Sequence, residues 1–172
     1  MNTFEIAPSP NLMETISHSG YTLEAAIADL IDNSISGKAR NISVDFNYRF
    51  MDSTVTITDD GYGMSLEDLK DSLRIAHKSI RDNREVEDLG RFSLGLKSAS
   101  ASYCRKLSIS TKKLDNNQFT AVLDFDHLLK VNKWEAFLIE NPREIQKHGT
   151  IITWEHLSFI ENDEEKAQSY FN

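Results

Sequence analysis

Residues 53–76 read STVTITDDGYGMSLEDLKDSLRIA, and this stretch decides the fold. Its first part alternates β-branched residues, which predicts a strand. Its last part begins with Ser65 and has Asp68 three residues on, a close relative of the capping box, which predicts a helix. The DG pair between them is a strong hairpin signal, but no returning strand follows it. Gly61 and Gly63 instead let the backbone turn sharply and approach a flat ligand closely.

The adjacent carboxylates Asp59 and Asp60 do not form a calcium loop. Such a loop places oxygen ligands at alternating positions, a glycine sixth and a glutamate twelfth, and TDDGYGMSLEDL lacks that register. Asp59, at the end of the predicted strand, is able to accept hydrogen bonds from an amino group such as that of adenine. We interpret Asp60 as a turn residue whose side chain is replaceable at little cost.

A helix is predicted over TLEAAIADLIDNSISGKA, because Thr22 suits the N-cap and Gly37 suits the C-terminal stop. Asp29 and Asn33 fall one turn apart on the same stripe of this helix. They fit the solvent-facing side of an amphipathic helix. They also fit a carboxylate that orients a water beside an amide oxygen that holds a cation, although the pair alone is a weak signal for such a site. The helix alone leaves both interpretations open.

The segment GRFSLGLKSASAS, residues 90–102, nearly spells a phosphate-binding P-loop. Leu96 separates Gly95 from Lys97, and an acidic loop rather than a buried strand precedes the segment, so we reject that motif. Gly90 and Gly95 still allow several backbone N–H groups to converge at a helix N-terminus, which favours an anion, with Lys97 nearby as a cation. A loop followed by a packing helix of small residues is the alternative.

The remaining elements are predicted from alternation and turn signals. Strands are expected at NISVDFNY, KLSISTKK, QFTAVLDFD, KWEAFLIE and GTIITWEH, a helix at FSLGLKSASASY, a long surface loop over residues 78–90 and an acidic helical tail over residues 161–172. Helices come early in the chain and strands late, which excludes regular βαβ alternation. The pattern predicts an α+β fold built as a two-layer sandwich.

Composition indicates a soluble single domain. The 172 residues carry a net charge of −8, which argues against a surface that coats nucleic acid. The single cysteine, Cys104, excludes an internal disulfide, and we interpret it as a small buried hydrophobe. The sequence has neither a signal peptide nor an apolar run of about 18 residues, so we expect a cytoplasmic protein without membrane contact.

Four segments in order, ADLIDNS, DDGYGM, GRFSLGLKSAS and GTIITW, resemble the four boxes of the GHKL ATPases. That superfamily contains the DNA gyrase B subunit, the large heat-shock chaperone, histidine kinases and the MutL-type mismatch-repair proteins. The resemblance covers about residues 17–157 and is nearest to the MutL and MORC branch. It implies a two-layer α/β sandwich of the histidine-kinase-like ATPase type, with a mixed, mostly antiparallel sheet and helices on one face. The implied cofactors are ATP or ADP and Mg²⁺.

The resemblance also implies roles for the residues that match each box. Asn33 matches the asparagine that holds Mg²⁺, Asp59 the aspartate that pairs with the adenine amino group, and Thr150 the threonine that supports this pairing. Gly61, Gly63 and Met64 are assigned to the base pocket. The lid that wraps the phosphates is matched by Gly90, Arg91, Phe92, Ser93, Leu94, Gly95, Leu96 and Lys97.

One departure concerns Asp29, where the ATP-hydrolysing members usually carry a glutamate as general base. Aspartate is one methylene shorter, and geometry is the first criterion for a general base. The expected function is Mg²⁺-dependent ATP hydrolysis with Asp29 as base, driving a conformational or dimerisation switch. The alternatives are a nucleotide-sensing module without turnover and the ATP-binding domain of a histidine or serine kinase.

We expect residues 1–172 to be one domain and an N-terminal fragment of a longer ATPase, with a nucleotide lid over about residues 77–97. In the branch that the chain resembles, a second domain contributes a lysine to the γ-phosphate. A nucleotide-dependent homodimer is the expected assembly, and nucleic acid is expected as a partner only through the missing domains.

Overall fold

The computed structural model of the chain describes residues 9–12, 15, 20, 22–75, 95–139, 145 and 147–159. In chain order its elements are α2 (Leu23–Ser36), β1 (Ile42–Asn47), β2 (Thr54–Asp59), α3 (Leu66–Leu73), α4 (Gly95–Tyr103), β3 (Cys104–Lys112), β4 (Gln118–Asp124), α5 (Phe125–Val131), β5 (Phe137–Leu138) and β6 (Gly149–Leu157).

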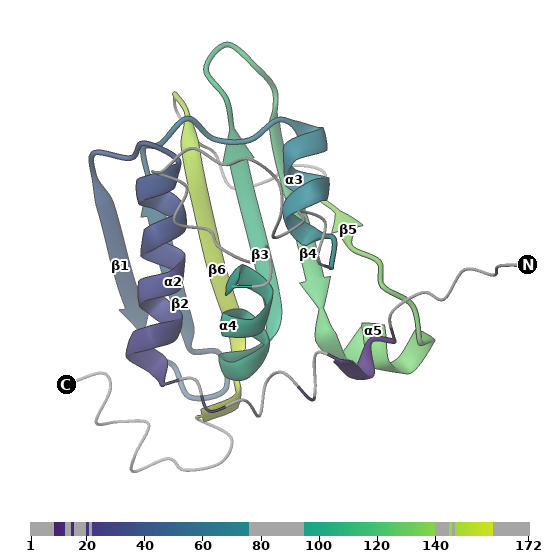
Figure 1. Ribbon diagram of the computed structural model, residues 1–172. Helices are drawn as coiled ribbons and strands as arrows, with labels where there is room; N and C mark the ends of the chain where they lie inside the picture. Colours follow the sequence, from purple (N-terminus) through teal and green to yellow (C-terminus); the bar gives the residue numbers. More distant parts are fainter. Residues whose placement is uncertain are drawn as a thin grey trace, which may run out of the picture.

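The strands form one six-stranded sheet in the order β1-β2-β6-β3-β4-β5, and each pair of neighbouring strands is antiparallel. Helices α2, α3 and α4 cover one face of this sheet (Figure 1). The predicted two-layer α+β sandwich is therefore confirmed, and within the described residues its sheet is antiparallel throughout rather than mixed. Strand β6 is the last of the described strands but lies between β2 and β3, so it joins the early and late parts of the described sequence.

The core lies between the helices and the sheet. Trp154 of β6 is fully buried there, and its indole Nε1–H donates to Ser100 Oγ of α4 at 2.8 Å. Cys104 is also fully buried, and burial raises the pKa of its thiol. The prediction that this cysteine is a small buried hydrophobe is confirmed.

The helix ends follow the predicted caps. The hydroxyl of Thr22 caps the first turn of α2, and Gly37 follows its last residue. Helix α3 begins with a complete capping box between Ser65 and Asp68. Asp68 also pairs with Lys113, just after β3, and the bonds from Lys113 and Ser65 lower the pKa of Asp68 to about 2. This pairing fixes the start of α3 against the sheet.

Two predicted strands differ in the structure. The strand expected over QFTAVLDFD ends at Asp124, because the carboxylate of Asp124 accepts a hydrogen bond from His127 N–H at 2.9 Å and so caps α5, a helix that the sequence did not predict. The strand expected over KWEAFLIE is reduced to the two residues of β5. Trp134 of that segment instead donates to Leu73 O at 2.8 Å, which holds its first part against α3.

The predicted loop over residues 78–90 and the predicted tail over residues 161–172 lie outside the described residues. Of the predicted lid, residues 95–97 alone are described, and they form the first turn of α4. Among the described helices, none is long and apolar enough to cross a membrane.

Candidate functional site

Asp59 lies at the end of β2, beside the start of β6, and its carboxylate accepts three hydrogen bonds. Oδ1 accepts from the backbone N–H of Gly61 at 2.9 Å and from that of Thr150 at 3.2 Å, and Oδ2 accepts from Ser34 Oγ at 2.8 Å. Burial raises the pKa of Asp59 despite these bonds. A carboxylate offers about four lone-pair directions, so these contacts leave one direction on Oδ2 for a ligand donor.

The loop over residues 61–64 connects β2 to α3 and lies in close contact with the backbone of its neighbours. Gly63 has a φ of +66°, and a Cβ at Gly63 would lie 2.0 Å from Lys112 O. A Cβ at Gly61 would lie 2.7 Å from Gly37 O. Both positions therefore require glycine, because any side chain would force the strands and the loop apart.

Thr111 of β3 links the loop over residues 61–64 to the start of β6. Thr111 Oγ1 accepts from Met64 N–H at 2.8 Å and donates to Gly149 O at 3.2 Å. Gly149 has a φ of +131°, and a Cβ there would lie 2.1 Å from Asp59 O. The strand register pairs Thr150 with both Asp59 and Thr111. The structure thus brings Asp59, Met64 and Thr150, which are distant in the sequence, to one place.

The structure contradicts the interpretation of Asp60 as a replaceable turn residue. Its Oδ1 accepts from the backbone N–H groups of Arg40 at 2.7 Å and Asn41 at 2.8 Å, and its Oδ2 accepts from Asn41 Nδ2 at 2.7 Å. These bonds, those from Asn41 first, lower the pKa of Asp60 to about 2. Asp60 anchors the residues before β1 to the end of β2.

Helix α2 carries the two residues predicted to act on metal and water. Asp29 and Asn33 are both half-buried, one turn apart. Gly95, the first residue of α4, lies against Asp29, because a Cβ at Gly95 would be 3.3 Å from Asp29 Oδ2. The fold therefore places the predicted general base beside a glycine of the predicted phosphate-binding segment.

Lys97 is fully buried. Its Nζ donates to Ser72 O, in the last turn of α3, at 2.6 Å, and burial lowers the pKa of the ammonium to about 8. In this structure Lys97 connects α4 to α3, while Leu96 packs against the core. Their role in nucleotide binding stays a prediction. The remaining residues predicted for the lid lie outside the described residues, namely Gly90, Arg91, Phe92, Ser93 and Leu94.

Three residues of the site were not predicted from the sequence: Ser34, Thr111 and His148. Ser34 continues the buried stripe of α2, so the helical period could have indicated a buried hydroxyl that needs a partner. Thr111 continues an apolar alternation on β3 and gives a similar signal. His148, whose Nδ1 lies 2.7 Å from Gly61 O, gives none, because 87 positions separate the two residues.

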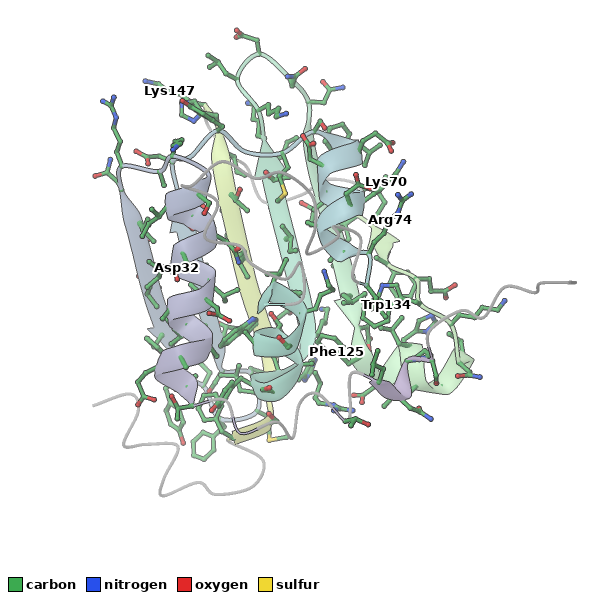
Figure 2. All side chains as sticks on the ribbon, in the orientation of Figure 1. Asp32, Lys70, Arg74, Phe125, Trp134 and Lys147 are labelled. Carbon is green, nitrogen blue, oxygen red and sulfur yellow. The ribbon has the colours of Figure 1, made fainter. Side chains whose placement is uncertain are left out.

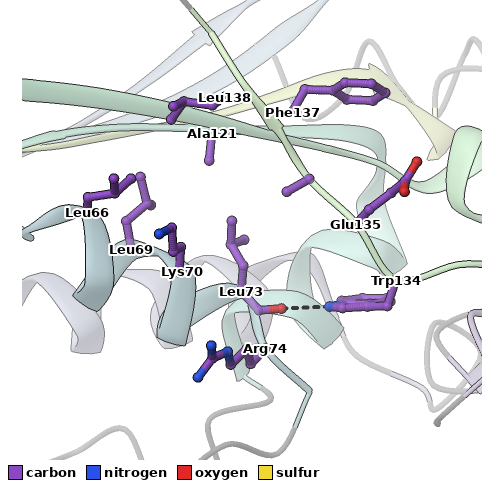
Figure 3. A pocket seen from close by; sticks show the side chains of 11 residues that line it. Leu66, Leu69, Lys70, Leu73, Arg74, Ala121, Trp134, Glu135, Phe137 and Leu138 are labelled. Carbon is purple, nitrogen blue, oxygen red and sulfur yellow. Dashed lines mark hydrogen bonds between the residues drawn. The ribbon is translucent and has the colours of Figure 1, made fainter.

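A separate apolar cavity of about 240 Å³ lies between α3, β4 and residues 134–138. Figure 3 shows Ala121 directed into it and the hydrogen bond from Trp134 Nε1 to Leu73 O at its edge. No predicted site residue is among the described residues that line it. Figure 2 places Trp134 on the side of the molecule opposite Asp32, so the cavity lies away from α2.

The chain matches known proteins both by family profile and by sequence identity. The profile of the family described as histidine kinase-, DNA gyrase B-, and HSP90-like ATPase matches residues 21–153, a range that contains the described site residues from Asp29 to Thr150. ATPase morc-1 of Caenorhabditis elegans is 30% identical over 103 residues, which cover 60% of this chain and 12% of that protein. The chain therefore corresponds to a small part of this relative.

Proposed function

The chain belongs to the histidine kinase-, DNA gyrase B- and HSP90-like ATPase family, and from that premise we propose that it binds ATP and hydrolyses it with Mg²⁺. The arrangement around Asp59 carries the proposal. Its carboxylate is held by three donors, and one lone-pair direction on Oδ2 is left for a fourth. Two glycines that tolerate no side chain, Gly61 and Gly63, lie beside it.

This arrangement favours adenine over guanine. The exocyclic amino group of adenine donates a hydrogen bond to the open direction on Asp59 Oδ2. The carbonyl that guanine carries at the same ring position would face the carboxylate as a second acceptor, and two acceptors do not bond. Because the Asp59 site is partly buried, the unmade bond is costly, so we expect clear discrimination between ATP and GTP.

Asp29 supplies the carboxylate that orients the attacking water in this proposal. Gly95 begins α4 beside that carboxylate, and the N-terminus of a helix is a favourable place for a phosphate. A carboxylate next to a phosphate position is the geometry that a general base for hydrolysis needs. The contact between these two residues therefore supports turnover as well as binding.

Asn33 is the residue that would hold Mg²⁺, through its side-chain amide oxygen. It is half-buried and lies one helical turn from Asp29. Mg²⁺ usually takes only one or two protein ligands beside phosphate oxygens and waters, so one amide oxygen fits such a site. When bound, the ion neutralises charge on the phosphates.

For the whole protein we propose that the ATP cycle drives a conformational or dimerisation switch. The matched region covers 12% of ATPase morc-1. A nucleotide-dependent homodimer, contacts with nucleic acid and a cytoplasmic location are accordingly proposals for the whole protein.

A second candidate function is nucleotide sensing without turnover. It is favoured by the short side chain of Asp29, because a displacement of a general base by about 1 Å is enough to lower a rate roughly a hundredfold. The two functions share the Asp59 site and differ only at Asp29. Binding and turnover must therefore be measured separately.

The test compares ATP affinity and ATP turnover of the full-length protein for the wild type, Asp29→Asn and Asp32→Asn. Asp32 lies on the same helix and has no predicted role, which makes Asp32→Asn a matched control. We expect Asp29→Asn to bind ATP like the wild type and to lose about a hundredfold in turnover, with Asp32→Asn unchanged. Equal turnover by wild type and Asp29→Asn would contradict the catalytic assignment. A wild type that binds without turnover would establish the sensing function, and a wild type that does not bind ATP would overturn both.

A further inference from the structure

The loop over residues 61–64 has no regular structure of its own, so its position depends on a few contacts. Three involve its backbone N–H groups, which donate to Asp59 Oδ1, Gly37 O and Thr111 Oγ1. A fourth involves a carbonyl: Gly61 O lies 2.7 Å from His148 Nδ1. His148 is half-buried and immediately precedes β6.

The two residues that follow His148 are held against Asp59, and this fixes the position of the His148 imidazole beside the loop. Gly149, the next residue, packs so closely that a Cβ there would lie 2.1 Å from Asp59 O. Thr150, one residue further, donates its N–H to Asp59 Oδ1. Residues 148–150 therefore each make a different contact with the site. His148 holds the loop, Gly149 allows the close approach, and Thr150 holds the carboxylate.

The hydrogen bond also defines the state of the ring. A carbonyl oxygen only accepts, so Nδ1 of His148 carries the hydrogen. Nδ1 donates in the neutral tautomer with this hydrogen and in the imidazolium, so the bond does not depend on protonation of Nε2. Asparagine places its amide nitrogen at the same number of bonds from Cα as Nδ1, whereas glutamine places it one bond further. Leucine fills similar space with no donor.

We propose that His148 is a positioning residue for the nucleotide base. By holding Gly61 O it sets the loop at the distance from Asp59 at which Gly61 and Gly63 form the floor of the base pocket. The inference rests on the proposed ATP binding. It concerns the base rather than the phosphates, so its effect is the same for ATP and ADP.

The test measures Kd for ATP and for ADP with the 172-residue chain and its variants, together with the thermal midpoint of each. We expect His148→Leu and His148→Gln to weaken both nucleotides by about tenfold, and His148→Asn to remain within about threefold of the wild type. His127→Leu is the matched control, because His127 pairs with Glu135 away from the site. It should bind as the wild type does.

The outcomes separate this inference from the proposed function. Wild-type affinity in His148→Leu or His148→Gln would overturn it, as would an Asn variant as weak as Leu or a loss confined to ATP. Should His148→Leu not fold, the comparison of Asn with Gln decides, and equal affinities overturn the inference. In each of these cases the proposed function still holds if the wild type binds ATP and Asp59→Asn binds it more weakly. Absence of ATP binding by the wild type would overturn both.

Discussion

Replacing Asp59 by asparagine should weaken nucleotide binding while keeping the fold. In Asp59→Asn the side-chain oxygen keeps the bonds from the N–H groups of Gly61 and Thr150, which Oδ1 now accepts at 2.9 and 3.2 Å. The amide nitrogen takes the place of Oδ2 and faces Ser34 Oγ, whose hydroxyl rotates to accept. All three internal contacts are thereby retained. The open direction, however, changes from an acceptor to a donor and meets the donor of the adenine amino group.

The loss follows from the bond that is no longer made. A hydrogen bond to a charged group contributes about 1.5–3 kcal/mol, which corresponds to about ten- to a hundredfold in Kd. Isothermal titration with ATP measures this loss, and thermal unfolding measures stability in the same samples. We expect a thermal midpoint close to that of the wild type, because the substitution also removes a carboxylate whose burial raises its pKa.

Asp60→Asn is the matched control, since it makes the same chemical change one residue away. It keeps an oxygen for the backbone N–H groups of Arg40 and Asn41 but replaces Oδ2, the acceptor for Asn41 Nδ2, with an amide nitrogen, and it removes the carboxylate charge that these donors stabilise. It should therefore lower the thermal midpoint while leaving ATP affinity near the wild-type value. Binding of ATP by Asp59→Asn within about twofold of the wild type would refute the base-pocket assignment, because a lost charged hydrogen bond costs more than that. A thermal midpoint for Asp59→Asn below that of Asp60→Asn would refute the account of the internal contacts.

Three further predictions concern pH, backbone contacts and the cavity. Burial raises the pKa of Asp59 above its ordinary value of 3.8, and the nucleotide needs the ionised form, so ATP affinity should fall on acidification before ordinary aspartates titrate. Over the same acidification, the raised pKa of Asp59 makes its protonation favour the folded state, so the stability difference between the wild type and Asp59→Asn should shift in favour of the wild type. If ATP affinity and this stability difference both fell as the pH was lowered, the assignment would be contradicted. Gly63→Ala should destabilise by at least about 2 kcal/mol in urea unfolding, because its Cβ would meet Lys112 O at 2.0 Å with a φ of +66°; a loss below about 0.5 kcal/mol would contradict this contact. Ala121→Val should raise the free energy of unfolding by about 1 kcal/mol by filling the apolar cavity, whereas Ala99→Val, in the fully buried core, should lower it. Equal changes in the two variants would show that there is no free space beside Ala121 and would contradict this prediction.

Local signals predicted the elements well and their arrangement less well. The cap at Thr22 and the capping box at Ser65 fixed the starts of two helices, because a cap is made by residues within one turn of each other. Asp124 was missed as a cap because it lies inside a run that also suits a strand. The insertion of β6 between β2 and β3 depends on pairing across most of the chain, which no local pattern contains.

The same distinction explains which parts of the site were predictable. Resemblance to known boxes predicted roles for Asp59 and Thr150, and the strand register pairs the two residues. The groups that hold these residues in place, Ser34, Thr111 and His148, come from three other segments and act through single hydrogen bonds. A sequence pattern records which residue types a site needs, whereas supporting contacts of this kind depend on the folded backbone.

The adjacent aspartates show how the fold assigns different roles to the same residue type. Side chains alternate along β2, so Asp59 shares the helix-covered face with Val55 and Ile57, while Asp60 follows the strand at its exposed end. The donors around Asp60 outweigh its small burial and lower its pKa to about 2, whereas burial outweighs the three donors around Asp59 and raises its pKa. The ionised carboxylate of Asp59 is thus only partly compensated in the folded chain. A ligand that donates one more hydrogen bond would supply the missing compensation, and for that reason we propose a binding role for Asp59, whereas the contacts of Asp60 are structural.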